Sequence, residues 1–316
     1  MPYVTVMSSP VYRQVTLEEI LDGYVELSRF RPVRNAQTGT VTRFRKYLPY
    51  DFVSIVNIVG MIQALDVFNK KYEHLIKEDK RNLYRHFEID KNSIDPATGR
   101  FKKRPIDAPC PELKIALTEL KVIFEDTFGA LYHTSAFAYI RGRCAVDSIR
   151  RHQGNNSHWF LKTDFSNFFG NTTPQFLSEM LKMIFPFSEL YNTKAGTEAL
   201  ETALSLCFLN GGLPQGSPIS PMLTNLMMIP IDHRLSNTLK TYTDKNHYIY
   251  TRYADDILIS SKVDFDYKEL VKYINEVLSE FRAPFSINEE KTRYGSGNGH
   301  NFKLGVILKE KNEITI

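Results

Sequence analysis

The sequence is poor in the features that mark secreted, membrane-spanning and metal-cage proteins. It contains three cysteines in 316 residues. Their odd number and their spacing fit neither a disulfide framework nor a set of metal ligands; they are Cys110, Cys144 and Cys207. No apolar run is long enough to span a bilayer, and we find no charged and apolar leader of the kind that directs secretion. We therefore expect a cytoplasmic protein with no structural disulfide and no membrane partner.

The sequence also has little net charge and no repeats or low-complexity segments. Its 40 Lys and Arg residues are balanced by 36 Asp and Glu residues, so the net charge of +4 does not by itself indicate a nucleic-acid partner. The basic residues are nevertheless clustered at residues 29–46 and 141–151, a distribution typical of nucleic-acid binding and also of solvated faces. Hydrophobic residues make up 42% of the chain, enough to bury a core spread over two subdomains.

Periodicity and turn residues predict a mixture of helices and strands. A capping-box pattern at Thr16–Glu19 predicts a helix to Phe30, and Asp51 can cap a helical region that continues to Arg85. Further helices are predicted at residues 174–185 and 197–208, after Ser217-Pro218 and after Asp266. Strands are predicted around Asp164, Asp255, Phe285 and Lys303.

Three aspartates lie at the ends of predicted strands. Two β-prone segments surround Asp255 and Asp256, which places both carboxylates at the tip of a strand-turn-strand unit. A short apolar segment, residues 159–161, leads to Asp164 in the same way. If these strands lie side by side, Asp164 and Asp255 can bridge two Mg²⁺ ions roughly 3.5–4 Å apart, as nucleotidyl transfer requires. We expect Asp256 to aim differently, as a looser ligand or a turn anchor. An Asp-Asp pair alone is equally typical of a solvated turn.

A third segment adds to the two aspartate motifs. Residues 211–226 read GGLPQGSPISPMLTNL. Together with Asp164 and its trailing aromatic residue, and with Tyr-Ala-Asp-Asp at residues 253–256, this segment resembles the reverse transcriptase family. In form it is more similar to the retron, group II intron and phage-defence enzymes of bacteria than to retroviral enzymes. The resemblance covers residues 101–307.

The resemblance implies an α+β fold of the right-hand polymerase type. It predicts a ferredoxin-like palm, a small antiparallel sheet backed by helices, at residues 157–316, with a helical insertion on the fingers side at about 172–212. Fingers are expected at 51–156 and an N-terminal extension at 1–50. The family's helical thumb is expected to be absent from this chain. Either the sequence ends before it, or a partner protein or another grip on the duplex replaces it.

The resemblance also implies a nucleotide site. Gln215 would contact the incoming nucleotide, and Gly216 would lie against the templating base pair, where the lack of a Cβ permits close approach. Phe169 would pack under the sugar and clash with a ribose 2′-hydroxyl, so that deoxynucleotides are preferred. Phe165 would contribute to the nucleotide and metal sites as a backbone neighbour. The alternatives are a helix start that needs no ligand and, for Phe169, a core position.

Basic residues are expected to bind phosphates. By the resemblance, Arg104 and Lys102 lie on a fingers hairpin and neutralise the triphosphate, although Lys102 and Lys103 also fit a solvated charge run. Residues 136–143 correspond to a segment that lies against the template, with alanine here in place of the family's glycine. The primer and template contacts implied are Arg141, Arg143, Tyr253 and the primer-grip residues Lys303, Leu304 and Gly305.

These observations predict an RNA-directed DNA polymerase that uses two Mg²⁺ ions, with Mn²⁺ as a substitute. Its partners would be an RNA template, a DNA or RNA primer and deoxynucleoside triphosphates. A structured non-coding RNA and a retron-like or phage-defence system are expected. Template-independent or protein-primed DNA synthesis on the same fold is an alternative, and a non-catalytic nucleic-acid-binding scaffold subunit is an alternative of another class.

Overall fold

The computed structural model describes residues 3–8, 11–16, 53–94, 98–128, 132–241, 248–297, 307–308 and 314–315. The chain divides into two compact units. The first comprises residues 1–131, 181–208 and 217–219, and the second comprises residues 132–180, 209–216 and 220–316. Residues 132–156, which the sequence analysis assigned to the fingers, belong to the second unit.

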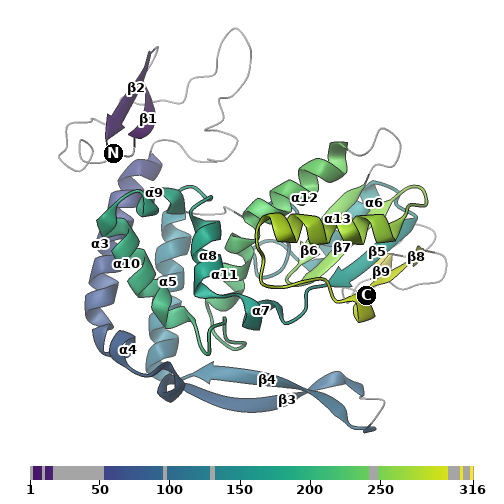
Figure 1. Cartoon of the computed structure of the whole chain (residues 1–316), viewed down its shortest axis with the longest axis horizontal. Helices are drawn as coiled ribbons and strands as arrows, with labels where there is room; N and C mark the ends of the chain where they lie inside the picture. The colour runs from purple at the N-terminus through teal and green to yellow at the C-terminus, as the bar shows by residue number, and fades with distance from the viewer. Residues whose placement is uncertain are drawn as a thin grey trace. The chain divides into compact units, whose positions relative to one another are not determined.

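A four-stranded antiparallel sheet forms the centre of the second unit (Figure 1). Its strands are β5 (Trp159–Asp164), β6 (Ile249–Tyr253), β7 (Asp256–Ser261) and β8 (Arg293–Ser296), in the order β6-β7-β5-β8. Helices separate β5 from β6, and α13 (Tyr267–Glu280) separates β7 from β8. This is the βαββαβ order of a ferredoxin-like sheet, and it confirms the predicted architecture of this part of the chain.

Helices cover both faces of this sheet. On β6, Tyr250 faces α12 (Ile229–Thr241), because its hydroxyl donates to Asp232. The neighbouring Thr251 accepts a hydrogen bond from Ser148 of α6 (Ala145–Gly154). Successive strand side chains point to opposite faces, so α12 and α6 lie on opposite sides of the sheet. Strand β7 is consequently buried from Ile257 to Ser261.

Short helices complete the second unit. They are α7 (Phe168–Asn171), α8 (Pro174–Leu181), whose last residue belongs to the first unit, and α11 (Ser220–Met227). The predicted helix after Asp266 is confirmed, since the Asp266 side chain accepts hydrogen bonds from the backbone N–H groups of Lys268 and Glu269 at the start of α13. A two-stranded pair, β9 (Ile307–Leu308) with β10 (Ile314–Thr315), places Ile314 against the α6 side of the sheet.

The first unit is a helical body with a long hairpin. Helices α3 (Val53–Lys71), α5 (Pro111–Phe128) and α10 (Lys194–Leu204) pack around a core that includes Leu65 and Leu117, with α4 (Glu73–Lys77) and α9 (Phe187–Tyr191) beside them. Strands β3 (Tyr84–Ile94) and β4 (Phe101–Pro109) pair antiparallel and lead into α5. A hairpin leading into a helix is what the sequence predicted here.

Several predicted element boundaries were wrong. The helical region predicted to reach Arg85 ends at α4 and a 3₁₀ turn, η2 (Lys80–Leu83), because pairing with β4 makes the chain extended from Tyr84. The helix predicted at 174–185 ends at Leu181, before Pro186, which cannot continue it. The helix predicted from Thr197 begins at Lys194, because the Thr193 hydroxyl accepts from the Gly196 N–H, and it ends at Leu204 before the 3₁₀ turn η3 (Ser205–Cys207).

Two other predicted elements are displaced. The helix expected to begin at Ser217-Pro218 begins instead at the next Ser-Pro pair, with Ser220; Gly216, which precedes both pairs, has a positive φ of 125°. Phe285 is not in a strand; its ring packs in the core against Phe165 and Phe168, and β8 is the fourth strand.

Other sequence predictions fall outside the described residues. These are the helix after Thr16, the Asp51 cap and the strand around Lys303. Thr16 itself ends β2 (Val11–Thr16), which pairs antiparallel with β1 (Tyr3–Ser8). No helix within the described ranges is both long and apolar enough to cross a membrane.

Candidate active site

The three aspartates predicted to act together meet at one end of the sheet. Asp164 ends β5 and lies directly opposite Asp256 of β7 in the strand register. Asp255 lies in the tight turn between β6 and β7, and its carbonyl accepts a hydrogen bond from the Phe165 N–H at 3.2 Å. Directly opposed residues of antiparallel strands share a face of the sheet. The predicted side-by-side arrangement of these strands is therefore confirmed, and it puts Asp256 on the same face of the sheet as Asp164. Asp255 lies near both, because the charges of Asp256 and Asp164 act on the pKa of its carboxyl.

Negative charge is concentrated at this end of the sheet. Burial raises the pKa of the Asp255 carboxyl, and the nearby charges of Asp256 and Asp164 raise it further. Burial also raises the pKa of Asp256, while the ammonium group of Lys162, 3.2 Å from its Oδ1, acts in the opposite direction. Two carboxyl groups thus carry their charge at an energetic cost, which a cation would relieve.

Two lysines at the site were not identified as functional by the sequence analysis. Lys291 contacts Asp164 Oδ2 through Nζ, and its side chain is 66% exposed. It ends a 3₁₀ turn, η4 (Glu289–Lys291), which is tied to the site because the Asn288 N–H donates to the Asp164 carbonyl at 2.8 Å. Lys162 precedes Asp164 by two residues on one strand, so alternation alone could have placed it on the same face. Lys291 has no such local signal, since 127 residues separate it from Asp164.

The carboxylates fit a divalent cation in their donor chemistry. Asp164 Oδ1 is buried and has no hydrogen-bond partner in the part of the chain that the structure describes. Within the same residues, no group of three or more His, Cys, Asp or Glu side chains is arranged to coordinate a metal ion by itself. Mg²⁺ does not need one, because it commonly takes one or two protein carboxylates and completes its shell with water and substrate phosphates. An unsatisfied carboxylate oxygen beside two other carboxylates is the donor set expected for such an ion.

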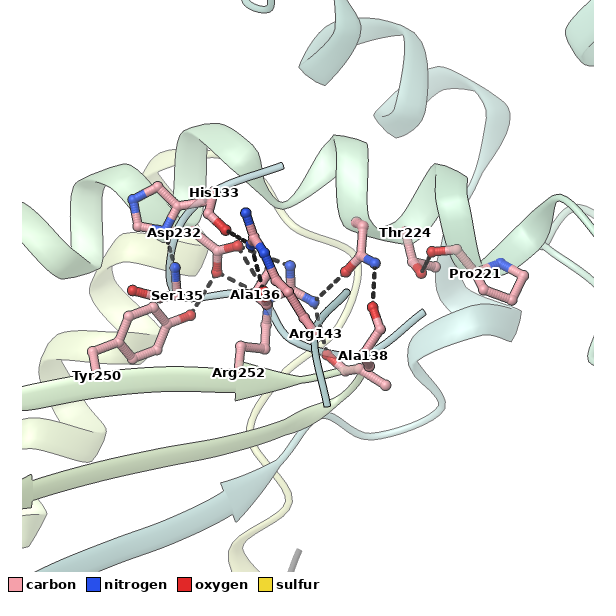
Figure 2. A network of polar contacts seen from close by, with 12 residues as sticks. His133, Ser135, Ala136, Ala138, Arg143, Pro221, Thr224, Asp232, Tyr250 and Arg252 are labelled. Atoms are coloured by element: carbon pink, nitrogen blue, oxygen red, sulfur yellow. Dashed lines mark hydrogen bonds and ion pairs between the residues drawn. The ribbon is translucent and has the colours of Figure 1, made fainter. Parts of the chain in front are cut away.

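A buried arginine holds the turn that carries Asp255. Figure 2 shows the Arg252 guanidinium reaching Asp232 of α12, with Nη2 2.8 Å from Oδ2 and Nε 2.9 Å from Oδ1. Both side chains are 0% exposed. Arg252 Nη1 also donates to the carbonyl of Ala254 at 2.9 Å, and Ala254 has a left-handed φ of 59°. The arginine therefore supports the residue immediately before Asp255.

The same network reaches the predicted template segment. Arg252 Nη1 donates to Asn225 Oδ1 at 3.1 Å, and Asn225 Nδ2 donates to the carbonyl of Ala138 at 2.8 Å. The backbone of Arg252 makes two further hydrogen bonds: its carbonyl accepts from the Phe137 N–H, and its N–H donates to the Ser135 carbonyl. Residues 135–138 are thus fixed to β6 and to α11 by buried hydrogen bonds.

Two segments of the second unit that carry predicted nucleotide-contact residues, Phe169 and Gln215, are joined by a backbone hydrogen bond. The Phe169 carbonyl accepts hydrogen bonds from Thr172 N–H at 3.1 Å and from Leu213 N–H at 3.0 Å. Two residues after Leu213 comes Gln215, which is half-buried, followed by the exposed Gly216. A φ of 125° at Gly216 is a conformation that residues with a Cβ rarely adopt.

The phenylalanines at residues 165–169 divide between core and surface. Phe165 and Phe168 are buried, with their ring centroids 5.4 Å apart, and both pack against Phe285. Phe169 is only half-buried, with its ring edge-on to that of Phe168 at 5.7 Å. Phe169 is therefore less buried than Phe165 and Phe168, which is compatible with a nucleotide-contacting role.

The predicted triphosphate ligands lie in the first unit, on β4. Lys102 and Arg104 are both exposed and, being two residues apart on a strand, share one face. Lys103 points to the other face and pairs with Asp90 at 2.5 Å. This arrangement supports Lys102 over Lys103 as the companion of Arg104.

The predicted template and primer residues have different surroundings. Arg141 is exposed, whereas Arg143 is half-buried and its Nη1 donates to the carbonyls of His133 and Ala136 at 2.7 Å. Burial lowers the pKa of Arg143, as does the charge of Arg151. Tyr253 is half-buried and lies opposite Asp256. The predicted primer-grip residues lie outside the described residues; they are Lys303, Leu304 and Gly305.

Comparison with known proteins finds similar sequences over most of the chain. A family model described as "Reverse transcriptase (RNA-dependent DNA polymerase)" matches residues 89–311. The retron Ec73 reverse transcriptase of Escherichia coli is 26% identical over 201 residues, which cover 58% of this chain and 61% of that protein. The retron Ec83 reverse transcriptase of the same organism is 26% identical over 258 residues, which cover 78% of this chain and 74% of that protein.

A similar solved structure is that of apo telomerase from Candida tropicalis, with a TM-score of 0.47 and 13% identity. The match covers 79% of this chain and 53% of that chain. The chain thus spans about three fifths of the length of the Ec73 enzyme and about half that of the telomerase.

Proposed function

Because the chain belongs to the reverse transcriptase family, with bacterial retron enzymes among its relatives, we propose that it is an RNA-directed DNA polymerase. It would extend a DNA or RNA primer on an RNA template with deoxynucleoside triphosphates. Its fold is of the right-hand polymerase type, with mixed helices and sheet. Fold alone does not specify chemistry, so the proposal rests on the site.

The observation that carries the proposal is the convergence of Asp164, Asp255 and Asp256, with one buried Asp164 oxygen left without a partner in the described residues. Asp164 and Asp255 would hold two Mg²⁺ ions, or Mn²⁺ in their place, with Asp256 and the backbone of Phe165 assisting. Bound in this way, the ions would supply a more acidic primer 3′-hydroxyl and neutralisation of the triphosphate and the leaving pyrophosphate.

The chain's own residues would bind and orient the substrates around the carboxylates. Phe169 would exclude a ribose 2′-hydroxyl, Gln215 would contact the incoming nucleotide, and the bare backbone of Gly216 would lie against the templating pair. Phosphates would be bound by cationic side chains, and the primer and template by residues near the turn and in the primer grip. These residues are Lys102, Arg104, Arg141, Arg143, Tyr253, Lys303, Leu304 and Gly305. Such positioning supplies most of the catalysis of phosphoryl transfer.

The proposal extends to the setting of the reaction. Similarity to retron enzymes favours a structured non-coding RNA as template, in a retron-like or phage-defence system in the cytoplasm. The predicted division into an N-terminal extension at 1–50, fingers at 51–156 and a palm at 157–316 is part of the proposal. A partner protein that helps to hold the duplex is included as well.

Primer extension tests the proposal. The chain would be compared with D255A and with E276Q, a control at an exposed carboxylate of α13 in the same unit. We expect template-dependent extension on an annealed RNA by the wild type and E276Q, and none by D255A. Incorporation that ignores the template but is lost in D255A would instead indicate a template-independent enzyme. Absence of incorporation by every protein would contradict the proposal and favour a scaffold.

A further inference from the structure

The two-residue turn at Asn210-Gly211 in the second unit has a defined backbone conformation. Asn210 and Gly211 both have positive φ, 50° and 81°. The residues on either side exchange two hydrogen bonds, Leu209 N–H to the Gly212 carbonyl at 2.9 Å and Gly212 N–H to the Leu209 carbonyl at 3.0 Å. Positive φ at both central residues is the mark of a type I′ hairpin turn, for which Asn-Gly is the favoured sequence.

This turn presses Gly212 against the backbone of the Phe169 segment. A Cβ at Gly212 would lie 2.0 Å from the carbonyl oxygen of Gly170 and 2.7 Å from its carbonyl carbon. Both atoms belong to the backbone, so no side-chain rotation can relieve the overlap. The next residue, Leu213, donates its N–H to the Phe169 carbonyl at 3.0 Å. Gly212 is therefore the residue that allows this close backbone contact.

The contact joins two groups that the proposed function assigns to one nucleotide. Phe169 would lie under the sugar, and Gln215, three residues after Gly212, would contact the same nucleotide. Leu213 and Pro214, which connect Gly212 to Gln215, are buried. A buried connection tied by a hydrogen bond to the Phe169 carbonyl leaves little freedom between the two groups.

We propose that Gly212 is a positioning residue for sugar discrimination, which holds Phe169 at a fixed distance from the nucleotide-binding segment at Gln215. The inference rests on the proposed function, because it needs Phe169 to act on the sugar. Gly212 itself touches no substrate. It acts through the Phe169–Gly170 backbone.

The size of the effect follows from the overlap. An ordinary contact begins at 3.4 Å, so a methyl group 2.0 Å from the Gly170 oxygen must push the two segments apart by more than 1 Å. Displacements of this size near a reacting centre can cost up to about 100-fold in rate. A Phe169 ring that is displaced from the sugar would also leave room for the ribose 2′-hydroxyl. We expect G212A to lower the preference for deoxynucleotides over ribonucleotides by about tenfold.

The test measures kcat/KM for adding one deoxynucleotide and the matching ribonucleotide to a primer on RNA. G60A is a matched control, because a Cβ there meets nothing within 4 Å, and it should leave activity and preference unchanged.

A second variant covers the case in which G212A does not fold. N210A/G211A strains the turn without placing an atom against Gly170, and it should lower the preference by a smaller factor. Circular dichroism would establish that each variant is folded. A preference within about twofold of wild type in folded G212A, or in N210A/G211A where G212A is unfolded, overturns the inference.

F169V separates failure of the inference from failure of the proposed function. If F169V lowers the preference and G212A does not, sugar discrimination by Phe169 is supported and the proposed role of Gly212 is wrong. If F169V leaves the preference unchanged, the proposed sugar discrimination by Phe169 is wrong, and the inference about Gly212 is wrong with it. If both single variants lower it, the double variant should lose little more than F169V alone, because G212A acts only through Phe169.

Discussion

Asp232→Asn is expected to destabilise the second unit strongly. The substitution keeps the shape of the side chain and removes the charge that faces Arg252. Three of the five hydrogen bonds of the Arg252 guanidinium go to Asp232, at 2.8, 2.9 and 3.2 Å. Tyr250 donates a further hydrogen bond to Asp232 Oδ1 at 2.6 Å. The variant would leave the guanidinium buried without a counter-charge.

The magnitude follows from the complete burial of both partners. Burial lowers the pKa of Arg252, but the Asp232 carboxylate more than compensates, so the pKa is raised overall. Removing one partner of such a buried pair typically costs 3–5 kcal/mol, since the remaining charge is uncompensated. We therefore expect D232N to lower the free energy of unfolding by about 4 kcal/mol.

Urea unfolding followed by circular dichroism measures this change. E280Q is the matched control, because it breaks another Arg–carboxylate pair involving α12, that of Arg234 and Glu280 at 3.0 Å. The side chains of this pair are 46% and 52% exposed, so its loss should cost at most about 1 kcal/mol. A D232N protein no less stable than E280Q would refute the reasoning that the buried charge of Arg252 depends on Asp232 for its compensation.

Three further predictions concern pH, backbone conformation and the triphosphate. Burial, aided by the charge of Arg151, lowers the pKa of His152 to about 3. Below about pH 6.5 the unfolded chain binds a proton at His152 that the folded chain does not bind. The free energy of unfolding should therefore fall by about 2 kcal/mol between pH 7.5 and pH 5, and this fall should be absent in H152Q. An equal loss in H152Q would assign the effect to other groups. G216A should reduce single-nucleotide addition by about tenfold or more, since a Cβ is strained at a φ of 125°; unchanged kinetics would contradict this. R104Q should raise the KM for deoxynucleotides about tenfold, with K103Q as the control on the opposite face of β4; equal effects of the two would indicate a general charge effect.

The sequence alone predicted the elements whose signals are local. The strand that ends at Asp164 and the strand-turn-strand unit at Asp255 are both present, as is the helix capped by Asp266. Each of these depends on residues within one short segment, such as β-branched runs, a turn or a capping side chain. Local propensity is sufficient in such cases.

Features that depend on distant partners were missed or displaced. The Ser-Pro signal occurs twice between residues 217 and 221, and the local pattern does not distinguish the two; the helix begins at the second. Phe285 has a strand-like neighbourhood, but packing against Phe165 and Phe168 places it in the core.

The polar partners at the site illustrate the same limit. Arg252 directly precedes the Tyr-Ala-Asp-Asp motif, yet the contacts of its side chain depend on Asp232, 20 residues earlier, and on Asn225. Lys291 is brought to Asp164 by the fold. No spacing rule in the sequence predicts either contact, because each depends on how separate elements pack.

The rate of single-nucleotide addition by D164N, D255N and D256N tests the central claim most directly. Each change keeps the side-chain shape and removes one of the converging carboxylates. The proposal predicts that D164N and D255N lose about 10³-fold in rate on a primed RNA template, and that D256N loses less. A D164N or D255N protein, folded as judged by circular dichroism, that adds nucleotides within about tenfold of the wild-type rate would contradict the assignment of the catalytic centre.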